Sequence, residues 1–345
     1  MSLATLATRL AERAPVPDGL VRAAIAHFVE RARRDLAGGH EADALFAEEM
    51  TGRPIAEHVA AANAQHYEVP AAFFAQVLGP RRKYSSGLFD DAADRSLDRA
   101  AARALEETCA HADLTDGQRI LELGCGWGSL SLHMAQRYPR ARILAVSNSA
   151  SQRAAIEADA RARGLANLRV VTADMNDFWP ERDFDRIVSV EMFEHMANWR
   201  SLLARIAGWL APDGRLFMHV FSHIDTPYRF EAAGGEDWIA THFFTGGLMP
   251  SHTLIGQFAD LFALEAQWRW SGEHYRRTAD AWLANFDANR AAIMPILRQT
   301  YGADAKLWAR RWRLFFLATA GLFGARGGEV WGVSHYRLRP AAAGR

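Results

Sequence analysis

The chain has 345 residues, with 40 basic and 40 acidic side chains and only two cysteines, Cys109 and Cys125. The balanced charge gives no reason to expect a nucleic-acid partner, and the cysteine spacing fits neither a disulfide framework nor a zinc ribbon. The first residues lack the apolar core of a signal peptide, and the longest apolar stretch, 314–323, is well short of the ~20 residues that span a membrane. We therefore expect a cytoplasmic protein with no integral membrane association.

Residues 1–65 are predicted to be helical, because apolar residues such as Leu20, Ile25, Phe28 and Val29 recur at helical spacing. From residue 119 onward, short apolar runs alternate with helical stretches. The predicted strands are 120–123, 142–146, 168–171, 187–190, 216–220, 264–270 and 330–338. Five successive strand–helix units are typical of an α/β fold with a doubly wound, mostly parallel sheet. A helical insertion, roughly 279–323, separates the last two predicted strands.

The segment ILELGCGWGSL (120–130) joins the first predicted strand to a helix. Glu122 ends the strand, and Gly124, Gly126 and Gly128 follow. Glycines permit a tight turn and a close approach of the backbone to a ligand. Dinucleotide-binding loops have the wider spacing G-x-G-x-x-G. The pattern here resembles the start of class I S-adenosylmethionine (SAM) methyltransferases. The alternative, a turn that only packs strand against helix, is disfavoured by the strand–helix series that follows.

Polar residues also follow the second and third predicted strands. Many such methyltransferases hold the ribose hydroxyls with a carboxylate after the second strand, where this chain has Asn148. Gln152, one helical turn later, can supply hydrogen bonds instead. Asp174 and Met175, after the third strand, fit a cleft that binds the adenine amino group and covers its face. On its own, Asp174 is equally compatible with a helix N-cap.

The segment SVEMFEHM (189–196) places Glu191, Glu194 and His195 directly after a predicted buried strand. Two carboxylates and an imidazole are costly to desolvate there, so their presence indicates a site that accepts protons. Taken singly, Glu191 is also compatible with a solvated loop acid, and His195 with a histidine bound to a backbone carbonyl. His219 and His223 with Glu194 suggest a metal site, but no CxxC or HExxH motif accompanies them and we expect no metal.

These motifs together resemble the cyclopropane-fatty-acid synthase and mycolic-acid methyltransferase superfamily, and more closely its coclaurine N-methyltransferase branch, over about residues 63–339. HYEVPAAFFAQVLGPRRKYSSGLFDD (66–91) matches the first helix and Tyr-Ser turn of the family, which implies that Tyr84 and Ser85 contact SAM. DWIATHFFTGGLMPS (237–251), WSGEHYRRTADAWLANFDANR (270–290) and WGVSHY (331–336) also fit this branch.

The resemblance implies a Rossmann-like SAM-binding sheet and a division of the chain into two parts. Residues 1–100 are expected to form a helical cap that closes over the cofactor. Residues 101–345 are expected to form the catalytic domain, with a helical insertion at about 275–325 that encloses the substrate.

The resemblance also leaves two chemistries open. Cyclopropane synthases hold a bicarbonate base with a Cys, a Glu, a His and a Tyr, and the matching positions here are Ser86, Glu194, His219 and Tyr275. The Cys is therefore missing. Those synthases usually have Gly at the position of Glu191, whereas the amine-methylating branch has Glu in an E-x-x-E-H pattern.

An aliphatic amine is largely protonated near neutral pH, so its site must attract the cation and then remove a proton. Glu191 and Glu194 can attract it, and His195 or a carboxylate can accept the proton. Phe193, Trp238 and Phe244 are candidates for stacking on a ring or facing the cation. In the alkene alternative, an unpaired charge at Glu191 would be costly beside a hydrocarbon chain.

We therefore predict a SAM-dependent methyltransferase that N-methylates a small, aromatic or alkaloid-like amine and releases S-adenosylhomocysteine. The alternatives are cyclopropane-type methyl transfer to an unsaturated acyl chain and, more distantly, a non-catalytic SAM-binding protein; a homodimer stays open. The predicted catalytic residues are Glu191, Glu194, His195, His219 and Tyr275. The predicted cofactor-binding residues are Tyr84, Ser85, Glu122, Gly124, Gly126, Gly128, Asn148, Gln152, Asp174 and Met175.

Overall fold

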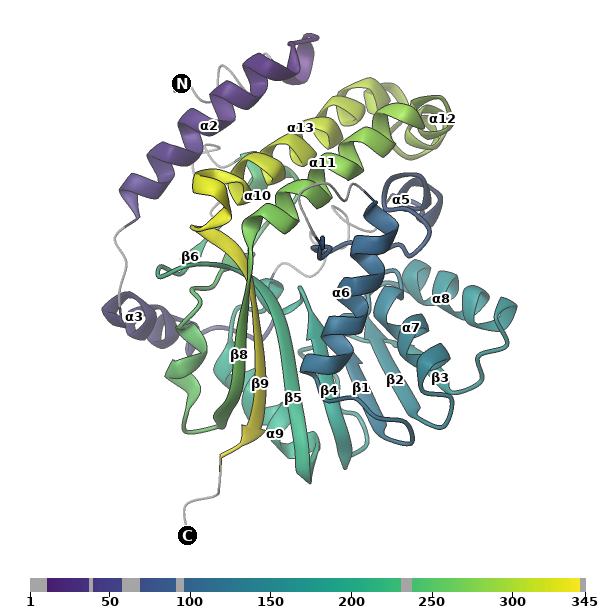
Figure 1. Cartoon of the computed structure of the whole chain (residues 1–345), viewed down its shortest axis with the longest axis vertical. Helices are drawn as coiled ribbons and strands as arrows, with labels where there is room; N and C mark the ends of the chain where they lie inside the picture. Colours follow the sequence, from purple (N-terminus) through teal and green to yellow (C-terminus); the bar gives the residue numbers. More distant parts are fainter. Residues whose placement is uncertain (1–10, 37–39, 58–68, 91–95, 231–237, 342–345) are drawn as a thin grey trace.

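The structure is a computed structural model that describes residues 11–36, 40–57, 69–90, 96–230 and 238–341. Its centre is a seven-stranded sheet with the strand order β3-β2-β1-β4-β5-β9-β8 (Figure 1). The strands of this sheet are β1 (Arg119–Leu123), β2 (Arg142–Ser147), β3 (Leu168–Thr172), β4 (Phe184–Val190), β5 (Leu210–His223), β8 (Phe262–Ser271) and β9 (Trp331–Pro340).

The sheet confirms the predicted doubly wound topology. Strands β1 to β5 pair in parallel, and β9 pairs antiparallel with both β5 and β8. The strand order reverses between β1 and β4, and ligands bind at such a switch point beyond the carboxyl ends of the strands. Two short strands that the sequence did not predict, β6 (Tyr228–Arg229) and β7 (Leu248–Met249), form a separate antiparallel pair.

Helices surround the sheet on several sides. They are α2 (Asp18–Asp35), α3 (His40–Met50), α5 (Ala71–Val77), α6 (Leu97–His111), α7 (Ser129–Arg137), α8 (Ala150–Ala162), α9 (Trp199–Trp209), α10 (Trp238–His242), α11 (Gly272–Ala288), α12 (Arg290–Tyr301) and α13 (Ala305–Phe323), with 3-10 turns η1 (Phe193–His195), η3 (Leu254–Phe258), η4 (Gly302–Asp304) and η5 (Ala325–Gly328). Within the described residues, no helix is long and apolar enough to cross a bilayer.

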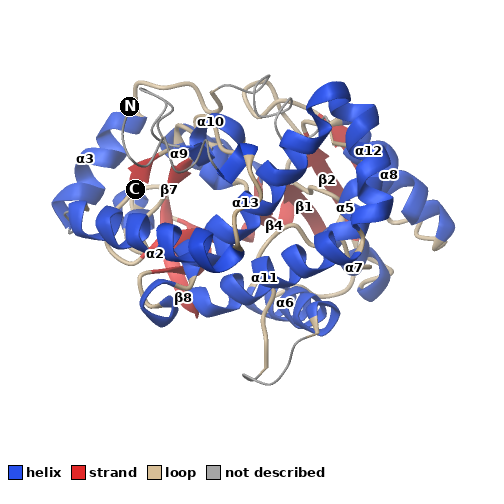
Figure 2. Cartoon of the chain, turned by 90° about the horizontal axis from the view of Figure 1, so that it is seen from above, coloured by secondary structure: helices blue, strands red, loops and turns tan. Residues whose placement is uncertain are grey.

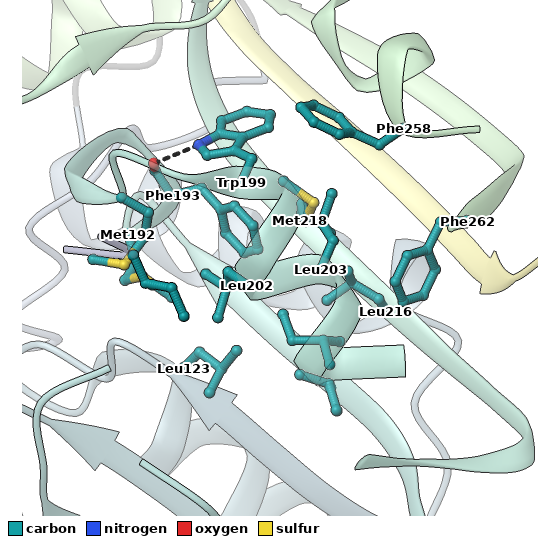
Figure 3. Packing of buried hydrophobic residues seen from close by; sticks show 14 of the residues in the cluster. Leu123, Met192, Phe193, Trp199, Leu202, Leu203, Leu216, Met218, Phe258 and Phe262 are labelled. Atoms are coloured by element: carbon teal, nitrogen blue, oxygen red, sulfur yellow. Dashed lines mark hydrogen bonds between the residues drawn. The ribbon is translucent and has the colours of Figure 1, made fainter. Parts of the chain in front are cut away.

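Alternating side chains of the strands build two apolar cores, because successive residues of a strand point to opposite faces. Ile120 packs with residues of α6 and α7, whereas Leu121 packs with residues of α9. Seen from above, α6 and α7 lie on one side of the strands and α9 on the other (Figure 2). The α9 core includes Leu202, Leu216 and Met218 (Figure 3). The strands are therefore buried on both faces, as parallel strands usually are.

A helical layer lies over the end of the sheet where the parallel strands finish (Figure 1). Helices α11, α12 and α13 form the insertion between β8 and β9, which begins at Gly272, earlier than the predicted start at about 275–279. Helix α2 packs along α13, and α5 packs against α11 and α12. The predicted helical character of 1–65 is confirmed for α2 and α3, whereas residues 51–57 form turns and an isolated bridge between Ala56 and Met196. Residues 1–10, 37–39, 58–68, 91 and 237, which fall in this region or in the quoted motifs, lie outside the described residues.

Candidate active site

A cavity lies at the carboxyl ends of β1, β2 and β4, between the sheet and the helical layer. Most residues that the sequence proposed for the cofactor line it: Tyr84, Ser85, Glu122, Gly124, Gly126, Asn148, Gln152, Asp174 and Met175. Glu191, His195 and Tyr275 line the same cavity. Gly128, Glu194 and His219 do not belong to its wall.

The three glycines of the loop after β1 all have left-handed backbone angles, but they meet different neighbours. A Cβ at Gly124 would lie 2.6 Å from Met192, and a Cβ at Gly128 would lie 2.6 Å from Ile156 of α8. A Cβ at Gly126 would meet no protein atom within 4 Å. Gly128 therefore serves the packing of α7 against α8, while Gly126 keeps space open on the cavity side.

Glu122 is the penultimate residue of β1 and is buried with its carboxylate at the cavity. The hydroxyl of Ser131 donates to its Oε2 at 2.5 Å. Burial raises the pKa of Glu122 to about 7, and the Ser131 hydrogen bond lowers it only in part. A cationic ligand would stabilise the ionised form of this carboxylate.

The ends of β2 and β3 supply polar groups to the same cavity. Gln152, 2% exposed, accepts a hydrogen bond from the Ser147 hydroxyl at 2.6 Å. Asp174 accepts the backbone N–H of Asn176 on its Oδ1 at 2.8 Å, and the residue also lines the cavity. Residues 175–177 form a turn and not a helix, so Asp174 is not a helix N-cap, and its position at the cavity agrees with the ligand interpretation.

Glu191 follows β4 and has the left-handed backbone angle φ +47°, which is uncommon for a residue other than glycine. Its Oε1 accepts the backbone N–H of Ser86 at 3.0 Å and lies 3.2 Å from Nε2 of His219. Its Oε2 accepts the Tyr275 hydroxyl at 2.6 Å. Three distant parts of the chain thus hold one carboxylate at the cavity wall.

Lys83 is a buried cation beside this carboxylate that the sequence did not single out. Its ammonium group donates to the Ser85 hydroxyl and to the Ser86 carbonyl, the latter at 2.8 Å. Burial lowers the pKa of Lys83 to about 8 against the opposing effect of Glu191. Burial also raises the pKa of Glu191, while Lys83 and Tyr275 lower it. The only sequence signal for Lys83 is its place before the Tyr-Ser turn.

The structure places Glu194 beneath the cavity wall. The turn η1 directs its Oε1 to the backbone N–H of Phe221 in β5 at 2.7 Å, and among the described residues its Oε2 has no hydrogen-bond partner. Burial raises the pKa of Glu194 well above its ordinary value, and the charge of Glu191 adds to this effect. Burial therefore favours the protonated form of Glu194, and the side chain does not belong to the cavity wall.

His195 and His219 lie in different environments. The His195 ring packs against Phe244 with 4.4 Å between ring centroids, and both residues line the cavity. His219 is fully buried, and its Nδ1 lies 2.8 Å from Nε2 of His335. Burial lowers the pKa of His219 well below its ordinary value. Among the described residues, no His, Cys, Asp and Glu side chains gather as a metal-ligand set.

Two of the three aromatic residues expected at the substrate lie elsewhere. Phe193 is buried against Trp199, whose Nε1 donates to the Phe193 carbonyl at 2.8 Å (Figure 3). Trp238 donates to Glu12 at 2.9 Å and does not line the cavity. The aromatic residues that do line it are Tyr84, Trp127, Phe221, Phe230, Phe244, Tyr275, Trp282, Phe315 and Phe323.

Comparison with known proteins identifies the family. The model described as mycolic acid cyclopropane synthetase matches residues 56–332. The chain belongs to that family. It is a SAM-dependent methyltransferase, as the sequence predicted.

Individual relatives agree with this assignment. The methyltransferase is 37% identical over 286 residues to (S)-coclaurine N-methyltransferase of Thalictrum flavum subsp. glaucum, covering 81% of this chain and 79% of the relative. It is 30% identical over 271 residues to cyclopropane-fatty-acyl-phospholipid synthase of Escherichia coli, covering 78% of this chain and 66% of that one. A crystal structure of coclaurine N-methyltransferase bound to N-methylheliamine and SAH superposes with a TM-score of 0.93 at 31% identity, covering 98% and 100% of the two chains.

The cavity of this methyltransferase fits SAM, whose sulfonium makes the methyl group electrophilic. Gly126 leaves room that a side chain would fill, and Glu122 offers a carboxylate whose ionised form a cation stabilises. Asn148, Gln152 and Asp174 provide hydrogen-bonding groups along the strand ends.

Proposed function

We propose that this methyltransferase transfers the methyl group to the nitrogen of a small amine that carries an aromatic ring. The observation that carries the proposal is the Glu191 carboxylate, fixed at the cavity wall by Ser86, His219 and Tyr275. The aromatic lining of the cavity supports an acceptor with a ring, because ring faces pack favourably on one another and on cations.

The backbone of Glu191 supports a role in function. A non-glycine residue in the left-handed region costs about 1–3 kcal/mol and persists where surrounding contacts hold it. The cyclopropane synthases that the chain resembles usually have glycine at this position, which adopts such angles without strain. A glycine at position 191 would avoid the backbone strain but would provide no carboxylate. The strained Glu191 therefore indicates that the carboxylate has a function at this position.

The partners of Glu191 support an amine over an alkene acceptor. Three of the four positions that the resemblance links to bicarbonate, Ser86, His219 and Tyr275, bind the Glu191 carboxylate here. The Glu191 side chain thus makes the contacts that a bound bicarbonate would make in the cyclopropane synthases. An acyl chain beside this fixed anionic group would add to its desolvation cost, whereas an ammonium group would neutralise it.

The chemistry follows from this arrangement. The Glu191 carboxylate attracts the protonated amine and accepts one proton from it, which frees the nitrogen lone pair. Because burial raises the pKa of Glu191, its proton affinity lies closer to that of the amine than an exposed carboxylate's would. We assign the base to Glu191, since Glu194 lies outside the cavity wall, and we assign His195 to substrate contact beside Phe244.

Several expectations from the sequence remain part of this proposal. Residues 1–100 would act as a cap over the cofactor and 101–345 as the catalytic domain, which is supported by Arg82, Lys83, Tyr84 and Ser85 lining the cavity from the N-terminal part. A cytoplasmic location and a homodimer stay predictions from the sequence.

Mass spectrometry of protein incubated with SAM and two acceptor pools tests the proposal. One pool holds benzylisoquinoline-like and simple aryl-alkyl amines, and the other holds phospholipids with unsaturated acyl chains. We expect a gain of one methyl group on an amine. A methylene gain in the lipid pool, without amine methylation, would contradict the proposal.

Two substitutions of Glu191 then test its role as the base. Glu191→Gly restores the glycine of the resembling synthases and empties the position, whereas Glu191→Gln fills it with a group that accepts no proton. Both should lower amine turnover at least about 10²-fold, with SAM affinity retained. Added bicarbonate should restore part of the activity only in Glu191→Gly. Retained turnover in both variants would show that another group is the base.

A further inference from the structure

A chain of hydrogen-bonded histidines runs from Glu191 away from the cavity. His219 and His335 are both fully buried, and His111, which is 9% exposed, leads to Glu107. The successive distances are 3.2 Å from Glu191 Oε1 to His219 Nε2, 2.8 Å from His219 Nδ1 to His335 Nε2, 2.8 Å from His335 Nδ1 to His111 Nδ1, and 3.1 Å from His111 Nε2 to Glu107 Oε1. Each of the three rings therefore uses both of its nitrogens.

The fold positions these rings by strand register and by the end of a helix. His219 of β5 and His335 of β9 are directly paired residues of neighbouring antiparallel strands. His111 is the last residue of α6, and its ring stacks on Trp268 of β8 with 3.8 Å between centroids. Trp270 lies 4.3 Å from the His335 ring. Trp268 and Trp270 thus pack on the rings of His111 and His335, and both of these histidines are buried.

We infer that this chain of hydrogen-bonded histidines conducts the proton released in each turnover from Glu191 to the surface at Glu107. The inference rests on the proposed amine methylation. The Glu107 side chain is 40% exposed and can pass a proton to water, whereas Glu191 is 8% exposed.

The hydrogen-bond pattern admits two complete arrangements. With a proton on Glu191, each of the four bonds has a donor pointing outward, and the last, His111 Nε2–H, donates to ionised Glu107. One proton shifted along each bond gives the reverse pattern, with Glu191 ionised and Glu107 protonated. Every donor faces an acceptor in both states, so one proton crosses without leaving an unpaired buried group. Glu107 then releases the proton to water, and the three imidazoles must return to their first tautomers before a second proton can cross.

The reaction supplies one proton per turnover. The secondary ammonium gives a proton to Glu191, and its nitrogen then bonds to the methyl carbon as the carbon–sulfur bond breaks and the electron pair stays on sulfur. The products are a protonated tertiary amine, neutral S-adenosylhomocysteine and the proton on Glu191. That proton must leave before Glu191 can act as a base again.

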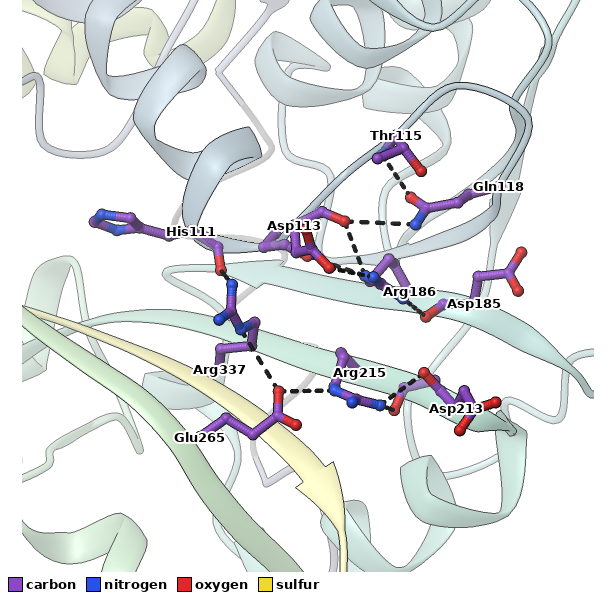
Figure 4. A network of polar contacts seen from close by, with 12 residues as sticks. His111, Asp113, Thr115, Gln118, Asp185, Arg186, Asp213, Arg215, Glu265 and Arg337 are labelled. Carbon is purple, nitrogen blue, oxygen red and sulfur yellow. Dashed lines mark hydrogen bonds and ion pairs between the residues drawn. The ribbon is translucent and has the colours of Figure 1, made fainter.

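The charges around the rings disfavour storage of the proton on an imidazole. Lys83 lies near His219 and His335, and Arg337 lies near His111. Arg337 also donates to the His111 carbonyl at 3.4 Å and pairs with Glu265 at 3.5 Å (Figure 4). Burial and these cations lower the pKa of all three histidines, although Glu107 opposes the shift at His111. A proton therefore passes through the rings and does not rest there.

Substitution of His111, at the outer end of the chain, tests the inference. With an aryl-alkyl secondary amine, His111→Ala should lower the steady-state rate about tenfold or more. The first turnover, measured with enzyme in excess, should keep its wild-type rate, because Glu191 can hold one proton. Imidazole added to the buffer should fill the vacated space and restore the steady-state rate.

Two substitutions of neighbouring glutamates on α6 test the inference even if His111→Ala fails to fold. Glu107→Gln should lower the steady-state rate, and Glu106→Gln, which removes the same charge from a neighbouring exposed position, should leave it unchanged. Unchanged steady-state rates in both His111→Ala and Glu107→Gln would overturn the inference. Equal losses in the first and later turnovers, without recovery by imidazole, would also overturn it. Failure of the proposed function is distinct, since the wild-type protein would then methylate no amine.

Discussion

Two buried carboxylates at the ends of neighbouring strands dominate the chemistry of the site at the scale of single residues. Glu122 is the penultimate residue of β1 and Glu191 follows β4, and burial raises the pKa of both. Their partners differ: Glu122 accepts one hydroxyl, whereas Glu191 has Lys83 nearby and several hydrogen bonds. We expect Glu122 to respond to the charge of the cofactor and Glu191 to exchange a proton with the acceptor.

The pKa of Glu122 predicts how SAM affinity depends on pH. Because its pKa in the folded protein is raised to about 7, the carboxylate is protonated below that pH and ionised above it. A cationic ligand binds the ionised form, so affinity should be highest above pH 7 and fall by up to about tenfold per pH unit below it. Calorimetric titration with SAM from about pH 5.5 to about pH 8.5 measures this slope.

Glu122→Gln is the control for this dependence. The variant should bind SAM more weakly at high pH and lose the slope between pH 6 and pH 7, since the amide does not titrate. The same slope in wild type and variant would assign the titration to another group.

At the scale of elements, the loop between β1 and α7 combines two demands on glycine. Gly128 caps α7 at φ +82° and lies against Ile156, so the close packing of two helices requires it. Gly126, at φ +51°, has no protein neighbour for a Cβ and borders the cavity. Within this one glycine pattern, Gly128 is therefore required for helix packing and Gly126 for ligand space.

Alanine substitutions separate these two demands. Gly128→Ala should destabilise the fold by about 1–3 kcal/mol, through strain and the contact with Ile156. Gly126→Ala should cost about 1–2 kcal/mol of backbone strain but weaken SAM binding at least about tenfold, because its Cβ enters the ligand space. Urea unfolding and SAM titration of both variants measure the two effects. A larger loss of SAM affinity in folded Gly128→Ala than in Gly126→Ala would reverse the assignment.

At the scale of the whole molecule, aromatic side chains pack the helical insertion (α11 to α13) against the N-terminal helix α5 and against the end of α10. Trp312 of α13 is fully buried and lies 4.8 Å from Phe73 of α5 and 5.0 Å from Phe243, just after α10, between ring centroids. Phe315, one helical turn later, lines the cavity. The helical layer over the cavity thus depends on contacts between segments that are far apart in the sequence.

Trp312→Ala should lower the free energy of unfolding by about 3–5 kcal/mol, since it empties a large volume that several rings enclose. Trp312→Phe should cost less, because a ring still fills part of the space. Trp179→Ala is the matched control: Trp179 is 66% exposed, and its removal should cost about 1 kcal/mol or less. Urea unfolding of the three variants measures the differences. Equal losses at Trp312 and Trp179 would show that the ring cluster adds little.

The sheet and the glycine loop were predictable because their signals are local. The apolar runs of β1 to β5 and the spacing of Gly124, Gly126 and Gly128 report strand burial and tight turning within a few residues. The same local pattern misplaced Glu194, since it cannot show that η1 turns this side chain toward the backbone of β5. Glu191 and Glu194 are therefore close together in the motif E-x-x-E-H, but only Glu191 lines the cavity.

By itself the sequence determined the strand–helix series, the cofactor loop and the presence of acids after β4, because each depends on neighbours along the chain. Only the tertiary structure decided that Lys83 lies beside Glu191, that Tyr275 binds this carboxylate, and that His219 faces His335. These contacts join residues separated by roughly a hundred positions. Strand register and the packing of the insertion determine them, and neither leaves a pattern within any short segment.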